Sequence, residues 1–167
     1  MLGEVTQQIS DTIKAKLEGV HTAVPGTIVS LDTEKCTATV KPAMLFKKPD
    51  GTKISYPEIS GVPVVIPQSA GQKVTIAYPI KPGDGCLIIA AEQSIDLWRY
   101  EQETSTDLRF DLTNSICIPG LFNKPNAALA RACKTGALVI EAENIQITGN
   151  VTINGDLTTS GGIVRLN

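Results

Sequence analysis

The sequence has few aromatic and few charged side chains, which make up 4% and 19% of its 167 residues. The formal net charge is −2, so no broad basic surface is available for nucleic acid or an anionic membrane. No apolar run approaches the roughly 18 residues that a membrane span needs, and no secretory signal is recognisable. If the protein acts outside a cell, we therefore expect it to leave by another route, such as lysis.

Histidine is almost absent, and the cysteines are too widely spaced for a zinc motif. His21, the one histidine, has no second His or Cys nearby, so we expect a surface or linker residue rather than a ligand. The sequence also lacks a phosphate-binding glycine loop and a nucleophile elbow. We predict no catalytic residue, no metal site and no cofactor. The four cysteines (Cys36, Cys86, Cys117 and Cys133) are expected to be buried thiols, with disulfides as the alternative, and Cys36 and Cys86 lie in apolar patterns typical of strands.

Residues 1–22 are interpreted as an N-terminal helical arm. Apolar side chains recur there at spacings of three and four and form one stripe: Leu2, Val5, Ile9, Ile13 and Leu17. Gly19 is a helix stop signal. An arm that precedes a compact domain has little core of its own to cover. We therefore expect the stripe to dock on a neighbouring subunit, with packing on its own domain as the alternative.

Residues 23–122 show short alternating runs and tight turns that predict a small β-barrel. Asp50-Gly51 is a hairpin signal, residues 74–78 alternate as a strand would, and residues 86–91 are apolar enough for a central strand. Ile116, Ile118 and Leu121 are expected to return to the core. Five or six such strands fit a Greek-key barrel, and the OB-fold is the commonest match in size.

Four residues of this barrel are assigned structural roles: Asp84, Asp96, Trp98 and Arg109. Trp98 is expected to anchor one helical turn, and Asp96 to cap or hydrogen-bond that turn. Arg109 is expected to pair with an aspartate inside the barrel. Residues 123–134 are interpreted as a connector that contains a short helix.

The C-terminal segment, residues 135–167, carries a six-residue repeat marked by Gly149, Gly155 and Gly161. A short fixed period with glycine corners is typical of a β-helix. Three or four rungs cannot bury their apolar face alone, so we predict that three chains intertwine around one axis. The predicted trimer core consists of Ile145, Ile147, Val151, Ile153, Leu157 and Ile163. An ordinary meander of two or three strands is the alternative.

A helix, a small barrel and a terminal prism together resemble a known family. The order and spacing of residues 80–87, 92–98, 109–114 and 118–121 are similar to the N-terminal OB-fold domain of short central spike proteins. These spikes belong to contractile phage tails and R-type bacteriocins. The resemblance covers about residues 20–122 in detail and the remainder in architecture.

The resemblance implies a homotrimer under the baseplate hub, next to the tail tube, with no catalytic activity. The spike would puncture the bacterial cell envelope when the sheath contracts, and the particle would be released by lysis. Many such spikes bind iron at the apex through His-X-His, a motif that this sequence lacks. The resemblance therefore implies either a metal-free tip or a separate tip protein, and it leaves phage and bacteriocin open.

The alternative function is an OB-fold binding module, for single-stranded nucleic acid or for an envelope glycan as an adhesin. Nucleic-acid binding would need a basic groove with exposed aromatic side chains. The acidic overall charge argues against it, so we expect no nucleic-acid partner. An adhesin with its binding end at the tip would need aromatic side chains between residues 135 and 167, where the sequence has none.

Overall fold

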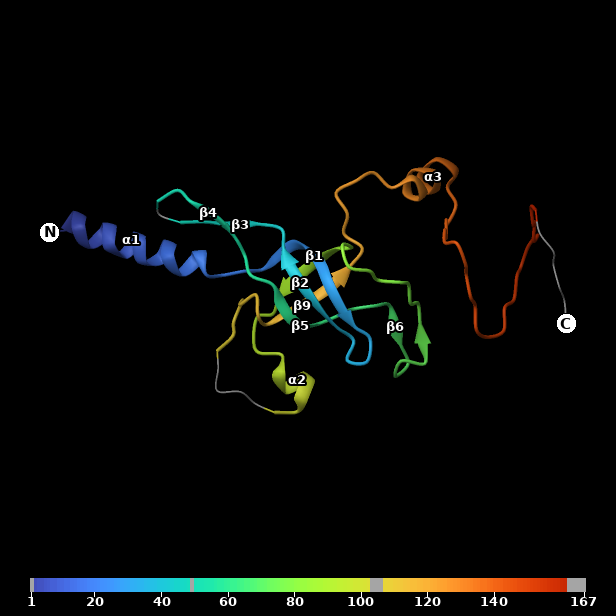
Figure 1. The fold of residues 1–167 in the computed structure, drawn as a ribbon, viewed down its shortest axis with the longest axis horizontal. Coiled ribbons are helices and arrows are strands. Elements are labelled where there is room, and N and C mark those ends of the chain that lie inside the picture. Colours follow the sequence, from blue (N-terminus) through green and yellow to red (C-terminus); the bar gives the residue numbers. More distant parts are fainter. Residues whose placement is uncertain (1, 49, 103–106, 162–167) are drawn as a thin grey trace. The chain divides into compact units, whose positions relative to one another are not determined.

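The computed structural model describes residues 2–48, 50–102 and 107–161. The chain divides into two compact units, residues 1–124 and 125–167. The first unit is mainly β and begins with a helix, and the second contains a short helix followed by extended chain (Figure 1). No helix in the described ranges is both long and apolar enough to cross a bilayer.

The helix predicted within the N-terminal arm is confirmed as α1, which ends just before Gly19, and the β region begins at residue 23 as predicted. The elements of the first unit are, in order, α1 (Leu2–Glu18), β1 (Ala23–Asp32), β2 (Thr37–Pro42), β3 (Leu45–Lys47), β4 (Lys53–Ser55), β5 (Ile59–Pro63), β6 (Gln68–Ser69), β7 (Val74–Thr75), β8 (Gly85–Ala90), α2 (Asp96–Tyr100) and β9 (Ser115–Pro119).

Five strands form one antiparallel sheet in the order β5-β2-β1-β8-β9. The sheet curls into a half-barrel, and its two edges approach each other where Val64, just after β5, forms a parallel bridge with Cys117 of β9. The backbone N–H of Val65 donates to the carbonyl of Cys117 at 2.9 Å. This strand order and the contact between the two edge strands fit an OB-like fold.

The core lies on the concave side of this sheet and follows the two-residue period of its strands. Ile28 of β1, Val40 of β2 and Ile88 of β8 have no exposed surface. On β8 the buried positions are Cys86, Ile88 and Ala90, so every second residue faces inward. The predicted central strand at residues 86–91 is therefore confirmed, with β1 and β9 on its two sides.

The last strand, β9, buries the face opposite to the one predicted. On β9 it is Cys117 that is fully buried, whereas Ile118 is 38% exposed and Leu121 is 44% exposed. Cys117 pairs with Ile88, which faces the core, and directly paired residues share one face of a sheet. A shift of one residue exchanges the two faces, so the prediction that Ile116, Ile118 and Leu121 fill the core was wrong.

Two other predicted strand positions lie outside the core. Cys36 is exposed and occupies the β1–β2 turn at φ 51°, so its assignment to a strand was wrong. The strand predicted over residues 74–78 is reduced to Val74–Thr75, and Ile76 is 67% exposed. This segment pairs only with β6 in a two-stranded hairpin apart from the main sheet.

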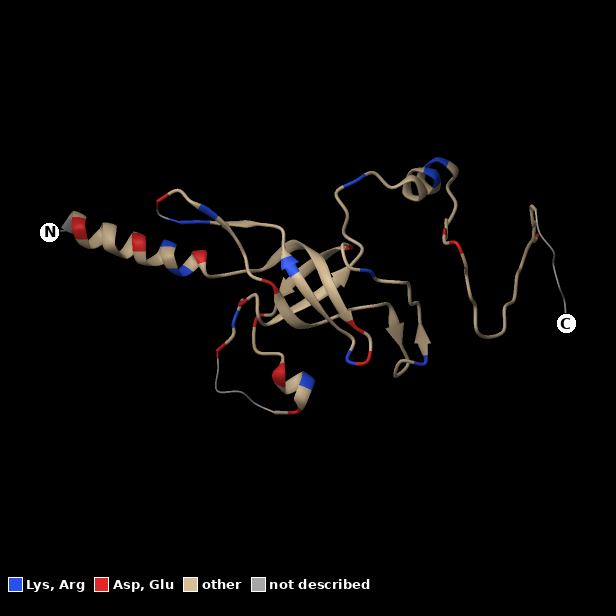
Figure 2. Ribbon diagram, viewed as in Figure 1, with Lys and Arg blue, Asp and Glu red and all other residues tan. Residues whose placement is uncertain are grey.

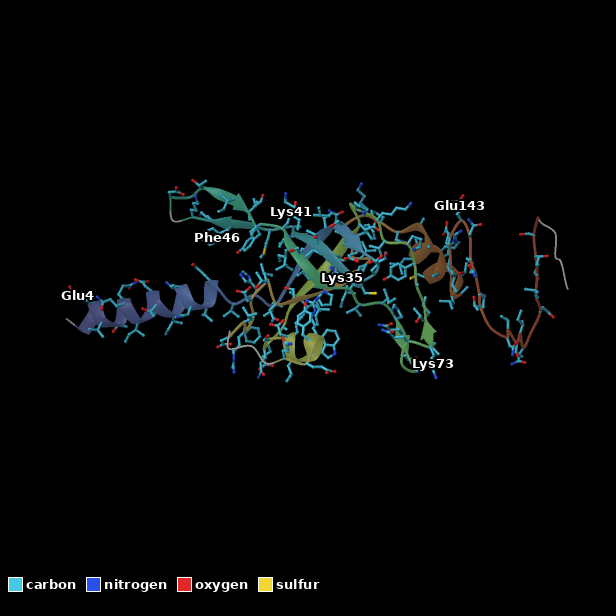
Figure 3. The ribbon with its side chains drawn as sticks, turned by 60° about the horizontal axis from the view of Figure 1, so that its bottom comes forward. Glu4, Lys35, Lys41, Phe46, Lys73 and Glu143 are labelled. Atoms are coloured by element: carbon cyan, nitrogen blue, oxygen red, sulfur yellow. The ribbon has the colours of Figure 1, made fainter. Side chains whose placement is uncertain are left out.

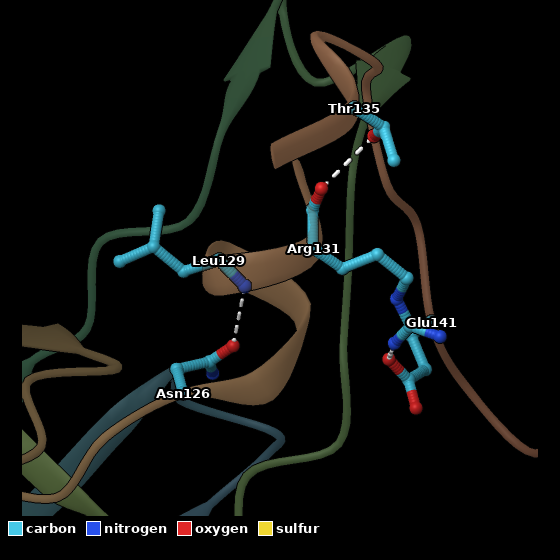
Figure 4. Close-up of polar contacts among 5 residues, drawn as sticks. All are labelled: Asn126, Leu129, Arg131, Thr135 and Glu141. Carbon is cyan, nitrogen blue, oxygen red and sulfur yellow. Dashed lines mark hydrogen bonds and ion pairs between the residues drawn. The ribbon is translucent and has the colours of Figure 1, made fainter. Parts of the chain in front are cut away.

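The second unit begins with α3 (Ala127–Thr135), which confirms a short helix in the connector. The side chain of Asn126 accepts a hydrogen bond from the N–H of Leu129 at 2.9 Å and caps the helix (Figure 4). Arg131 pairs with Glu141, and the Thr135 hydroxyl donates to the carbonyl of Arg131. From residue 137 to residue 161 the single chain forms neither helix nor strand, so it does not by itself show the predicted β-helix.

We expect Gly85→Ala to lower the free energy of unfolding by about 2–3 kcal/mol. A Cβ atom at Gly85 would overlap the carbonyl oxygen of Leu121, and a backbone atom cannot rotate away. Urea unfolding followed by far-ultraviolet circular dichroism measures the change. Gly3→Ala is the control, because its Cβ meets nothing within 4 Å. Equal midpoints for the two variants would contradict the packing described for β8.

Candidate functional site

The first candidate surface is the α1 stripe, defined by Val5, Ile9, Ile13 and Leu17. These side chains are 52%, 56%, 54% and 63% exposed, so more than half of each is in contact with solvent in the single chain. The side chain of Leu2, the fifth predicted member, lies outside the described residues. Polar side chains lie between the members of the stripe in the sequence. Among them, the side-chain amide of Gln7 donates a hydrogen bond to the carboxylate of Asp11. The structure therefore leaves the predicted docking face open.

The second candidate surface is the C-terminal aliphatic row, defined by Ile145, Ile147, Val151, Ile153 and Leu157. Their exposed fractions run from 52% to 70%. Ile163, the sixth residue predicted for the trimer core, lies outside the described residues. Burying one such side chain contributes about 1.5–3 kcal/mol, so this row is a large unused source of stability.

The glycines of the repeat have the backbone conformation that corners require. Gly149 has φ 139° and Gly155 has φ 147°, values that a residue with a Cβ rarely adopts. Gly161, the third glycine of the repeat, has φ 73°, so the three glycines share a positive φ but not one repeated conformation.

Asp84 has a structural role in the turn before β8. Its side chain accepts a hydrogen bond from the N–H of Lys81 at 2.7 Å. The carbonyl of Asp84 accepts from the N–H of Ile28, and the N–H of Gly83 donates to the carbonyl of Ile28, both at 2.8 Å. The turn is therefore joined to β1, which sets where β8 enters the sheet.

Of the other three residues assigned structural roles, Trp98 and Arg109 are exposed and Asp96 is partly buried. Arg109 pairs with Asp107 at 3.3 Å, and both side chains are more than half exposed. The prediction that Arg109 pairs with an aspartate inside the barrel was therefore wrong. Trp98 is 72% exposed on α2, so it does not anchor the helix in the core of this chain. Asp96 contributes its backbone N–H, which donates to the Ser94 hydroxyl at 3.3 Å, while Ile95 is the N-cap residue.

The residue that fixes the long β8–β9 connection is Asn114, which is 3% exposed. Its side-chain oxygen accepts from the N–H of Ile95 at 3.0 Å. Its side-chain nitrogen donates to the carbonyls of Gln93 and Leu108 at 2.7 and 3.1 Å. Sequence reasoning missed this role, because a polar residue in a turn-like segment gives no sign of being buried.

Two thiols lie together in the core between β8 and β9. Cys86 and Cys117 are fully buried, and their side chains are hydrogen-bonded. The bond to Cys86 and the loss of solvent raise the pKa of the Cys117 thiol, because both disfavour its thiolate. All four thiols are free, but Cys36 and Cys133 are exposed, so the prediction that they are buried was wrong. The buried pair therefore acts as small apolar side chains.

His21 lies where the arm meets the barrel. The His21 ring packs edge-on against Tyr56 with 5.7 Å between centroids, and the backbone N–H of His21 donates to the carbonyl of Phe110 at 2.9 Å. In the described part of the chain, no three His, Cys, Asp or Glu side chains gather where they could hold a metal ion.

Comparison with protein families matches residues 24–120 to the model described as the phage protein Gp138 N-terminal domain. The matched segment begins in β1 and ends just after β9, so it spans the whole curled sheet. The chain belongs to this phage protein family. Membership supports a structural role in a phage and an association with the virion. The search of curated proteins gave no match.

We expect Asn114→Asp to lower the free energy of unfolding by about 2–4 kcal/mol. The new carboxylate cannot donate to the carbonyls of Gln93 and Leu108 and would face both of them as a buried charge. Urea unfolding measures the loss, with the exposed Asn123→Asp as the control. If both variants unfolded at the same urea concentration, Asn114 would not hold this connection.

Proposed function

We propose that the chain is a non-enzymatic structural protein of a contractile tail, and that three copies form the central spike that punctures the bacterial envelope. The observation that carries the proposal is the aliphatic row, which one chain leaves more than half exposed. The match to a phage protein family supports a tail component. The curled sheet would be the collar of the spike, and residues 135–167 would supply one wall of its shaft.

Three chains around one axis solve the problem that the aliphatic row creates. A single row has one apolar face and unpaired backbone groups, both of which favour association. With threefold symmetry, the row of each chain meets two identical rows, and the side chains fill the middle of the shaft. The glycine corners at residues 149 and 155 would let each chain turn at the prism edges.

This arrangement explains how a spike could transmit axial force. Paired backbone groups of intertwined strands share the load among many hydrogen bonds, and a dry aliphatic core resists the entry of water. The protein would then supply stiffness, while contraction of a sheath supplies the work. The role needs no catalytic residue, metal ion or cofactor in the chain.

The α1 stripe is the proposed contact with the baseplate hub and the end of the tail tube. Its side chains are open, and α1 precedes the curled sheet with a short linker that contains His21. An amphipathic helix that lays its apolar face in a groove is a common docking mode between proteins. A separate tip protein would complete the other end of the shaft.

We expect Leu157→Asp to prevent trimer formation, because each trimer would have to bury three carboxylates at its axis. Thr158→Asp is the matched control, since the neighbouring residue of an alternating strand points to the opposite face. Analytical ultracentrifugation distinguishes the two variants. A Leu157→Asp protein that remained fully trimeric would exclude the proposed shaft core.

We expect Ile9→Glu combined with Ile13→Glu to give a soluble trimer that no longer joins the tail. Charges on the α1 stripe would be desolvated on docking, whereas Gln8→Glu, on a different face of the helix, should have little effect. Purified particles are assayed for the spike by immunoblot and for envelope damage by potassium efflux from target cells. Normal incorporation of the doubly charged variant would contradict docking through α1.

A further inference from the structure

The short helix α2 presents aromatic side chains to solvent, in a chain that has few of them. Trp98 is 72% exposed and Tyr100 is 56% exposed. The guanidinium group of Arg99 lies over the Tyr100 ring at 4.9 Å from its centroid and covers one face of it. Trp98 is the one tryptophan of the sequence, and it carries the largest exposed aromatic surface of the described residues.

These side chains border a groove made of two cavities of about 350 and 550 Å³. Both cavities are lined by Lys35, Thr37, Arg99 and Tyr100, so they adjoin. The larger cavity is completed by Trp98 and by the β6–β7 hairpin. Figure 1 shows α2, the β1–β2 turn and this hairpin around one end of the curled sheet, and Figure 3 labels Lys35.

The groove lies where OB-like folds bind their ligands. In such folds the second and third strands of the barrel, with the loops after the first and fourth strands, bind oligosaccharides and oligonucleotides. Here the corresponding strands are β2 and β5, which contribute Thr37 and Pro63 to the larger cavity. The corresponding loops are the β1–β2 turn, with Lys35, and the β8–β9 connection, with α2.

The groove has the mixed chemistry of a sugar site. One open indole face is available for stacking against a sugar ring. Amide groups of Gln68 and Gln72 and the hydroxyl of Thr37 line the same cavity and can bond to sugar hydroxyls. The α2 segment is held in place because Asn114 accepts from the N–H of Ile95, immediately before the helix.

The charge of the groove is too small for a nucleic-acid backbone. Lys35 and Arg99 are its cations, and Lys35 already lies 3.8 Å from Asp32. Figure 2 shows red as well as blue segments at both the β1–β2 turn and α2. Nucleic-acid grooves combine several cations with successive aromatic platforms, whereas this groove offers two cations and one uncovered ring.

We propose that this groove binds a short oligosaccharide, with a sugar ring stacked on Trp98 and its hydroxyls bonded to the glutamine amides. Arg99 would contact an acidic substituent on the sugar. The site goes beyond the proposed spike function and does not depend on it, because the groove is formed entirely by residues of the first unit. Contact with glycans of the envelope would then begin at the collar rather than at the tip.

The emission of Trp98 reports directly on this site, because the chain has no other tryptophan. The full-length protein is titrated with two probes, chitotetraose and the peptidoglycan tetrasaccharide that carries two muramic carboxylates. We expect a saturable shift to shorter wavelength with both, and tighter binding of the acidic probe that weakens in high salt. No response to either probe would overturn the proposal.

The variants separate stacking from a general effect on the protein. We expect Trp98→Ala, followed by calorimetry, to weaken binding at least about tenfold, and Gln72→Ala to weaken it less. Tyr78→Ala, an exposed aromatic substitution outside the groove, should bind normally. Unchanged affinity of Trp98→Ala would overturn the site.

Two further results would also overturn it. Tighter binding of an oligothymidylate than of either sugar would identify a nucleic-acid site instead. The second result is a Trp98 side chain that is already buried in the unliganded protein, with short-wavelength emission that acrylamide does not quench. This would show that a second copy covers the groove. Neither result bears on the number of chains in the shaft, so failure here is distinguishable from failure of the spike proposal.

Discussion

Apolar surface that a single chain cannot bury is the constraint on which this account depends. The row from Ile145 to Leu157 and the α1 stripe both keep more than half of each side chain exposed. In the sequence, the α1 stripe precedes the well-packed sheet and the C-terminal row follows it. A single chain therefore buries the core of the sheet but leaves both of these apolar surfaces exposed. Both surfaces are explained if the chain works only within an assembly, where other chains supply the missing contacts.

The curled sheet supplies most of the buried core among the described residues. Its core relies on fully buried side chains from β1, β2 and β8, and Val64 and Val65 join the edge strands at Cys117. The β8–β9 connection is held by Asn114, which fixes α2 and its exposed aromatic side chains. The described residues thus combine a well-packed curled sheet, a groove beside α2 and two exposed apolar surfaces.

Helical spacing of apolar residues predicted α1, a continuous apolar run predicted the central strand β8, and a segment rich in alanine predicted the connector helix α3. Each of these signals extends over at least five residues. The prediction failed where the pattern was short. On β9 the sequence Ile116-Cys117-Ile118 is apolar throughout, so only pairing with β8 decides which face is buried. Trp98 was expected to anchor a helical turn and Arg109 to pair with an aspartate inside the barrel, but nothing in the sequence specifies the tertiary contacts that would bury them. The described members of the α1 stripe and of the C-terminal row are exposed, as docking would require, and their partners remain predictions.

The most direct test of the central claim is the mass of the purified protein in solution, by native mass spectrometry or light scattering. The account predicts the mass of three 17.7 kDa chains, and an assembly that persists in strong detergent until the sample is boiled. A monomer at micromolar concentration, with the row from Ile145 to Leu157 accessible to solvent, would contradict the intertwined shaft and the spike function with it.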